Sequence, residues 1–164
     1  MSRLMDDMHV VAHTSTFVAS YADFFEGPGS GSIVYTDVFN LAKYRKVLFI
    51  IQLGAGATGT GVVTVESCDN VTPDTPTAIA FNYKAMTTSD TWGTTTAQAS
   101  TGFTTAAGAN KCYMVEVDAS ELSGTDHYVR LKITEDTDSP CDGCVLTILG
   151  DPRYQDDVPV TAIA

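Results

Sequence analysis

The sequence predicts an all-β fold, an antiparallel β-sandwich or jelly roll of about eight strands with extended terminal arms. Apolar residues alternate with a period of two over 113–117 and over 129–133, as they do on half-buried strands. Two shorter runs, Val47–Leu53 and Val145–Leu149, are apolar on both faces and are typical of strands covered on both sides. Links of hairpin length rich in Gly, Pro, Asp and Asn separate the runs. A closed barrel is the alternative fold.

The first 32 residues show no sustained period and end in a glycine- and serine-rich linker, so they predict an N-terminal arm. The expected organisation is an arm over 1–32, a β-sandwich domain over 33–150 and a tail over 151–164. Aromatic side chains in the arm and the tail are candidates for docking on a neighbouring subunit. These candidate partner-binding residues are Phe17, Tyr21, Phe24, Phe25 and Tyr154. A partly ordered terminus without such a role is the alternative.

The first half of the domain is organised around residues 46–68. A strand is expected over Ile33–Phe39, after which Asn40 can cap one helical turn over 41–44. The strand Val47–Leu53 then leads into a glycine-rich octet at 54–61 and an alternating run in which Val63 and Val65 share one face. This succession predicts a β-hairpin.

Further strands are expected in the second half of the domain. After a loop with two prolines at 69–76, Ile79, Phe81, Tyr83 and Ala85 share one face of a strand. Residues 86–110 read as a long connection with one or two short strands, in which Trp92 and Phe103 pack.

The two clearest alternations follow this connection. Tyr113, Val115 and Val117 are predicted to point inward, and so are Val129, Leu131 and Ile133 on the next strand. If these two strands pair, Glu116 is expected to lie opposite Arg130 or Lys132.

The charge excludes several classes of partner. The chain of 164 residues carries 20 acidic against 9 basic residues and a formal net charge of -11, which repels nucleic acid and anionic membranes. Its apolar runs fall short of the roughly 20 residues that span a bilayer. Acidic residues at Asp6 and Asp7 stand where a signal peptide has its apolar stretch, so synthesis in the cytoplasm is expected.

Several short motifs resemble chemical sites but lack their context. Gly54, Gly56 and Gly59 have the spacing of a dinucleotide-binding loop, yet a strand rather than a helix is expected after them. His9 and His13 lack the glutamate and third ligand of a zinc protease site, and His127 lacks a serine elbow. Surface histidines are the favoured interpretation of His9 and His13, and a residue at a strand edge is the favoured interpretation of His127.

The cysteines and one acidic loop contain residue types that bind metals. Cys141 and Cys144 form only half of a zinc-ribbon pattern, because Cys68 and Cys112 are isolated, so structural cysteines or a local disulfide are favoured. The loop with Asp136, Asp138 and Asp142 lacks EF-hand spacing and is expected to be solvated, with calcium as the alternative. No cofactor, metal or catalytic set is predicted, and the chain is not expected to be an enzyme.

Residues 33–164 resemble a family of small structural proteins of tailed bacteriophages and prophages. The motifs that carry the resemblance are Val-Phe-Asn-Leu-Ala-Lys-Tyr, Gly-Ala-Gly-Ala-Thr-Gly, Val-Thr-Val-Glu-Ser-Cys-Asp, Ala-Ile-Ala-Phe-Asn-Tyr-Lys, Ser-Asp-Thr-Trp-Gly, His-Tyr-Val-Arg-Leu-Lys and Leu-Gly-Asp-Pro-Arg-Tyr. The resemblance implies a capsid decoration or cement protein on the outer surface of the virion. Its implied partners are the major capsid protein and copies of itself.

Two alternative functions remain open at the level of the sequence. One is a neck or tail component of the same virion, since sandwich folds serve at several stations. The other is a carbohydrate-binding module, for which Trp92 and Tyr128 are the candidate sugar-stacking residues.

Overall fold

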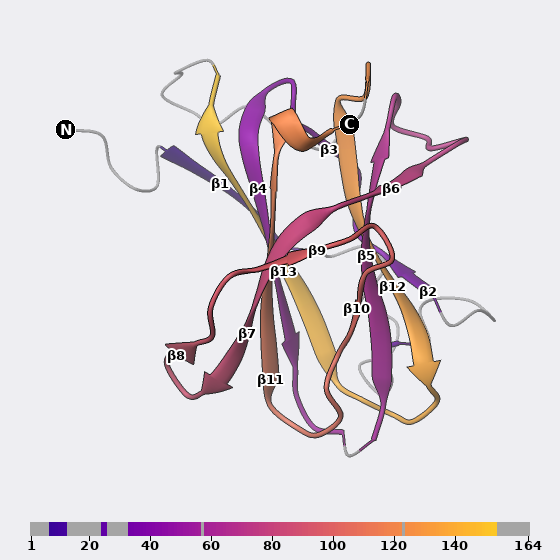
Figure 1. The fold of residues 1–164 in the computed structure, drawn as a ribbon, viewed down its shortest axis with the longest axis vertical. Coiled ribbons are helices and arrows are strands. Elements are labelled where there is room, and N and C mark those ends of the chain that lie inside the picture. The colour runs from indigo at the N-terminus through magenta and orange to yellow at the C-terminus, as the bar shows by residue number, and fades with distance from the viewer. Residues whose placement is uncertain (1–6, 13–23, 26–32, 57, 123, 154–164) are drawn as a thin grey trace.

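A computed structural model describes residues 7–12, 24–25, 33–56, 58–122 and 124–153, and these form two antiparallel sheets packed face to face (Figure 1). The predicted all-β sandwich is therefore confirmed. The described residues contain thirteen strands, more than the eight or so expected, and one short 3-10 helix, η1 (Ala119–Glu121). None of the helical structure in these ranges is long and apolar enough to cross a membrane.

The larger sheet has seven strands. In spatial order these are β1 (Met8–Ala12), β13 (Gly143–Pro152), β4 (Tyr44–Leu53), β11 (Lys111–Asp118), β7 (Phe81–Thr88) and β8 (Thr91–Trp92), with β9 (Thr96–Gln98) also paired to β7. All the pairings are antiparallel, and the longest ladders join β4 to β13 and to β11. The predicted central strand thus lies in the middle of this sheet.

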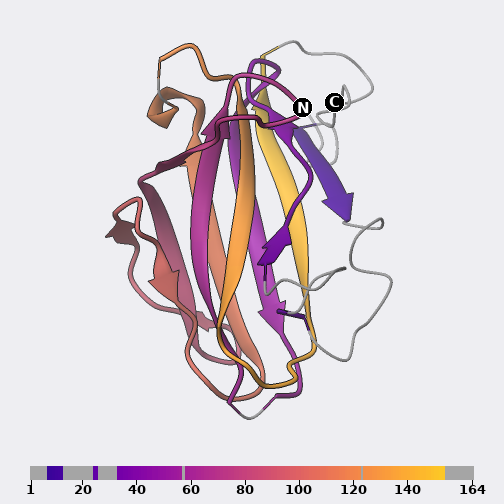
Figure 2. The same cartoon turned by 90° about the vertical axis from the view of Figure 1, so that its right-hand side faces the viewer.

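The smaller sheet has six strands. Its spatial order is β10 (Phe103–Thr104), β5 (Thr60–Cys68), β12 (Tyr128–Thr137) and β2 (Ile33–Tyr35), with β3 (Phe39–Asn40) paired to β12 and β6 (Thr77–Ile79) paired to β5. Figure 2 shows β5 and β12 in front of the larger sheet. Strands of both sheets run along the long axis of the molecule.

The core lies between the two inner faces, and the period-two patterns determine which side chains enter it. Tyr113, Val115 and Val117 on β11 are buried, and so are Val129, Leu131 and Ile133 on β12, which confirms their predicted direction. From β4 the residues Val47, Phe49, Ile51 and Leu53 are almost completely buried. Aromatic pairs such as Phe39 with Phe49 join the two layers at a ring separation of 5.8 Å.

The prediction of a hairpin around the glycine-rich octet, residues 54–61, is wrong. β4 belongs to the larger sheet and β5 to the smaller one, so the chain crosses from one sheet to the other between these two strands. Gly54 donates its N–H to the carbonyl of Asp142 at 2.7 Å, and Asp142 donates to Ala55 at 2.8 Å. A Cβ on Gly56 would lie 2.9 Å from Cys141, so this crossing packs too closely for side chains.

A second expected strand is divided in the same way. Ile79 ends β6 in the smaller sheet, and Phe81 begins β7 in the larger one. Both side chains are buried, at 7% and 2% exposure, because the bend at Ala80 directs each of them into the core from a different sheet. The expected strand Ile33–Phe39 is likewise two strands, β2 and β3.

Asn40 caps a turn and not a helix. Its side-chain oxygen accepts a hydrogen bond from the N–H of Ala42 at 2.8 Å, and its carbonyl accepts one from Lys43 at 3.3 Å. The chain does not continue into a helix because Tyr44, which is 1% exposed, already begins β4.

The described part of the N-terminal arm belongs to the sandwich. β1 pairs with β13 along the edge of the larger sheet, and Phe24 donates its N–H to the carbonyl of Cys141. Phe24 and Phe25 are buried, at 4% and 0% exposure, in spaces left open by Gly143 and Gly61. The sandwich therefore includes elements on both sides of the expected 33–150 range, since β13 also extends to Pro152.

Candidate interaction surface

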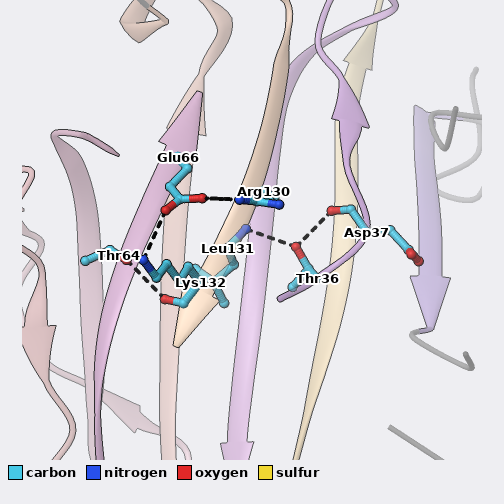
Figure 3. Close-up of polar contacts among 7 residues, drawn as sticks. All are labelled: Thr36, Asp37, Thr64, Glu66, Arg130, Leu131 and Lys132. Atoms are coloured by element: carbon cyan, nitrogen blue, oxygen red, sulfur yellow. Dashed lines mark hydrogen bonds and ion pairs between the residues drawn. The ribbon is translucent and has the colours of Figure 1, made fainter. Parts of the chain in front are cut away.

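The outer face of the smaller sheet carries a charged cluster at its centre (Figure 3). Glu66 on β5 and Arg130 on β12 are directly opposite each other in register. One carboxylate oxygen of Glu66 accepts from Nε of Arg130 at 2.8 Å and lies 2.7 Å from its Nη2. The other oxygen lies 3.4 Å from Nζ of Lys132. Because the Glu66 side chain is only 9% exposed, this carboxylate is held by two cations.

An exposed tyrosine completes the cluster. Tyr35 on β2 is opposite Lys132 in register and is 36% exposed. The guanidinium carbon of Arg130 lies 4.1 Å from the centroid of the Tyr35 ring, and Nζ of Lys132 lies 5.9 Å from it. Arg130 is therefore fixed between a carboxylate and an aromatic face.

The strand that carries Tyr35 is anchored by a side chain. Thr36 donates its N–H to the carbonyl of Leu131 at 3.0 Å, and its hydroxyl accepts from the N–H of Leu131 at 2.9 Å. The same hydroxyl donates to the carbonyl of Asp37 at 2.9 Å. A threonine hydroxyl thus replaces a backbone carbonyl directly after β2, and this contact fixes the position of Tyr35 at the end of the strand.

Chemically, this arrangement is a platform for binding. It presents an aromatic ring, guanidinium and ammonium donors, and the exposed Ile33 beside them. Tyr and Arg are enriched among the residues that dominate protein interfaces, and an immobilised Arg loses little side-chain entropy on binding. We call Ile33, Tyr35, Glu66, Arg130 and Lys132 the Tyr35 platform.

Sequence reasoning found two members of the platform but assigned them the wrong partner. Arg130 and Lys132 do point outward as expected, but Glu116 lies on β11 in the other sheet. Glu66 takes its place because β12 pairs with β5. The available signal was Glu66 itself, an acid in an outward position of a strongly apolar strand.

A shallow pocket lies at one end of the sandwich. It has a volume of about 210 Å³ and is lined by Leu41, Ala42, Ala119, Leu122, Asp126, His127 and Arg153. Asp126 accepts a hydrogen bond from the hydroxyl of Ser67 at 2.6 Å. Ser67 is completely buried, and its hydroxyl donates its hydrogen bond to the Asp126 carboxylate. This hydroxyl therefore has a structural role and is not accessible to a substrate.

The predicted partner-binding residues fall into two groups. Phe24 and Phe25 pack into the core of their own domain, with ring centroids 5.3 Å apart, so these two face inward and not toward a neighbour. Phe17, Tyr21 and Tyr154 lie outside the described residues, and so does His13.

The four cysteines are free thiols. Cys68 and Cys141 are buried, Cys112 is half-buried and Cys144 is exposed. Burial raises the pKa of the Cys68 thiol to about 11, against a smaller opposite effect of the Arg130 charge. Burial likewise raises the pKa of Cys112. Cys68 is therefore a neutral, unreactive thiol at physiological pH.

The remaining motifs are structural where they are described. The ring of His9 stacks on Tyr44 at 6.0 Å, and the carbonyl of His127 accepts from the N–H of Leu41 at 2.7 Å. Asp136 near the end of β12, and Asp138 and Asp142 in the link between β12 and β13, are all exposed. Within the described ranges, no three His, Cys, Asp or Glu residues are grouped as a metal site.

Comparison with known proteins gives distant structural likenesses. No protein-family model and no curated protein sequence matches the chain. The SPBc2 prophage-derived protein YomS is similar in structure with a TM-score of 0.45 and 12% identity, over 87% of this chain and 92% of YomS. The CBM22-1–GH10 modules of Clostridium thermocellum xylanase 10B, complexed with xylohexaose, give a TM-score of 0.41 and 15% identity, over 98% of this chain and 28% of theirs. Neither likeness is close enough to carry a function.

Proposed function

We propose that this chain is a structural protein of a tailed-phage particle, a decoration or cement protein that attaches to the outer surface of the capsid. The observation that carries the proposal is the Tyr35 platform, a preorganised Tyr and Arg surface on the outer face of a β-sandwich. The family resemblance of the motifs from residue 38 onward supports the same assignment.

The charge of the chain is compatible with this station. A net charge of -11 keeps particles that carry many copies dispersed, and it suits the outside of a shell whose interior is packed with DNA. Within this acidic surface the Tyr35 platform holds two cations against one carboxylate. We infer that it contacts carboxylate-bearing positions of the capsid protein.

Attachment to heads tests the proposal directly. Purified heads that lack the protein are incubated with it and sedimented, and the bound fraction is measured. Tyr35→Ala is expected to weaken attachment at least tenfold, because it removes exposed ring area and the group that fixes Arg130. Val71→Ala, a change at a 43% exposed loop residue, is the control and is expected to bind as the wild type does.

The number of copies bound per particle distinguishes a decoration protein from a neck or tail component. A decoration protein saturates the head surface, whereas a connector component stops at a single ring. Saturation at one ring, or binding unaffected by Tyr35→Ala, contradicts the proposed role of the platform.

Carbohydrate binding receives no support from the positions of its candidate residues. Trp92 lies on β8 of the larger sheet and Tyr128 on β12 of the smaller one, so they do not form one stacking platform.

A further inference from the structure

The outer face of the larger sheet carries six apolar side chains that no other described element covers. They come from four adjacent strands and are Val10, Leu48, Ile50, Met114, Leu146 and Ile148. Val10 is 53% exposed and the other five are half-buried. The sequence pattern predicts a cover for both faces of β4 and β13, yet the smaller sheet covers only the inner one (Figure 1).

The register places these side chains in two neighbouring rows. One row runs across the sheet through Val10, Ile148 and Leu48, and the next through Leu146, Ile50 and Met114. The row before them holds Met8, Gly150, Lys46 and Asp118, and the row after them holds Cys144, Gln52 and Cys112. Along the central strand β4 the face therefore reads polar, apolar, apolar, polar, with Lys46, Leu48, Ile50 and Gln52.

This order of rows is symmetric about a line between the two apolar rows. We propose that the face binds a second copy of this chain, with a two-fold axis lying along that line and perpendicular to the strands. The axis superposes each apolar row on the partner's other apolar row, and each polar end row on the opposite end row. A face that matches itself in this way fits an isologous dimer.

Charged residues at the margin of the face match under the same axis. Glu116 on β11 extends the first apolar row, and Lys84 on the neighbouring strand β7 extends the second. The axis exchanges the two rows, so Glu116 of each copy lies beside Lys84 of the partner subunit.

The face is large enough for a stable contact. Five strands about 4.8 Å apart and four rows about 7 Å apart cover roughly 600 Å² in projection, and side-chain relief increases the accessible area. Standard interfaces bury about 800 Å² per partner. Sheets that pack face to face also use apolar side chains of this kind.

The test measures the association state of the full chain by sedimentation equilibrium over a concentration series. The wild type is expected to dimerise, and Leu48→Lys is expected to raise the dissociation constant at least tenfold, because it places two charges in the apolar rows. Val71→Lys, in the exposed loop between β5 and β6 of the other sheet, is the control and is expected to dimerise normally. Circular dichroism establishes that each variant is folded.

Charge reversal tests the orientation of the copies. Glu116→Lys is expected to weaken the dimer severalfold, and the double variant Glu116→Lys with Lys84→Glu is expected to restore it. A folded monomeric wild type, or a dimer insensitive to Leu48→Lys, overturns the proposal. Self-association does not depend on a capsid, so its failure and the failure of head attachment are separate results.

Discussion

Glu66 shows how one residue links the core to the surface. The Glu66 side chain points outward, as the alternation along β5 predicts, but the neighbouring strands leave the residue only 7% exposed. A buried carboxylate is stable only when it is paired, and Arg130 supplies the pairing from the opposite position in the ladder. The same contact fixes Arg130 beneath Tyr35, so stability and the shape of the Tyr35 platform depend on one ion pair.

Removing the arginine is therefore expected to destabilise the fold. Arg130→Met leaves Glu66 with only the longer contact to Lys132, and we expect a loss of about 2 kcal/mol in the free energy of unfolding, measured in urea. Lys132→Met is the control, with an expected loss below about 1 kcal/mol, because Lys132 is more exposed. Glu66→Gln combined with Arg130→Met should recover part of the loss. Equal effects of the two single variants would contradict this account.

The cysteines are expected to differ sharply in reactivity. Iodoacetamide at pH 8 should label the exposed Cys144 first, and the buried Cys68 and Cys141 should react only after unfolding. For Cys68 the raised pKa, about 11, adds to the protection, because the thiolate is the reactive form. Mass spectrometry of peptides from native and urea-unfolded protein measures the order. Early labelling of Cys68 would show that the sheet opens there.

At this scale the direction of side chains was predictable and their partners were not. Alternation assigned Arg130 and Lys132 to the outside because period two is a property of a single strand. The identity of the carboxylate depends on which strands pair, and that depends on contacts distant in sequence. Tyr35 was missed because its importance comes entirely from Arg130.

Among the elements, the crossings between sheets distinguish this fold from a series of hairpins. The glycine-rich link from β4 to β5 and the bend at Ala80 both move the chain from one layer to the other. Each has the local sequence of a hairpin turn or a continuous strand, because glycine permits both paths and the inward side chains are apolar in either case. The burial pattern was therefore predictable, whereas the pairing was not.

The segment Phe24–Phe25 is expected to contribute to stability as part of the core. Phe25 is fully buried, and its ring packs against Gly61 so closely that a Cβ added there would lie only 2.7 Å from the ring. Phe25→Ala should cost about 3 to 5 kcal/mol in the free energy of unfolding, measured in urea. The control is Val71→Ala in an exposed loop, with little expected effect.

Truncation tests the same point for the whole arm. The sequence pattern alone predicts that deletion of residues 1–28 leaves a folded domain. Because the deletion removes β1 and both phenylalanines, the structure instead predicts a lower unfolding midpoint and binding of a hydrophobic dye. An unchanged midpoint would show that the arm is dispensable for folding.

For the molecule as a whole, the two outer faces have different chemistry. The smaller sheet presents charge and aromatic area in the Tyr35 platform, and the larger sheet presents two apolar rows. In the two proposals made above, the smaller sheet contacts the capsid and the larger sheet contacts a second copy of the chain. The composition predicted an acidic protein with a packed core. The apolar outer face of the larger sheet could be identified only from the observed strand pairing and register.

The overall charge also predicts how stability responds to salt. With 20 acidic and 9 basic residues the folded chain repels itself, and salt shortens the range of that repulsion from about 30 Å at 0.01 M to about 3 Å at 1 M. The Glu66–Arg130 pair is mostly buried and is screened less, so the net effect is stabilising. We expect the melting temperature to rise by a few degrees over this range, measured by calorimetry at pH 7.5. Neutralising two exposed acids with Asp74→Asn and Asp138→Asn should reduce the dependence on salt, and a melting temperature that falls with salt would mean that attractive surface pairs outweigh repulsion.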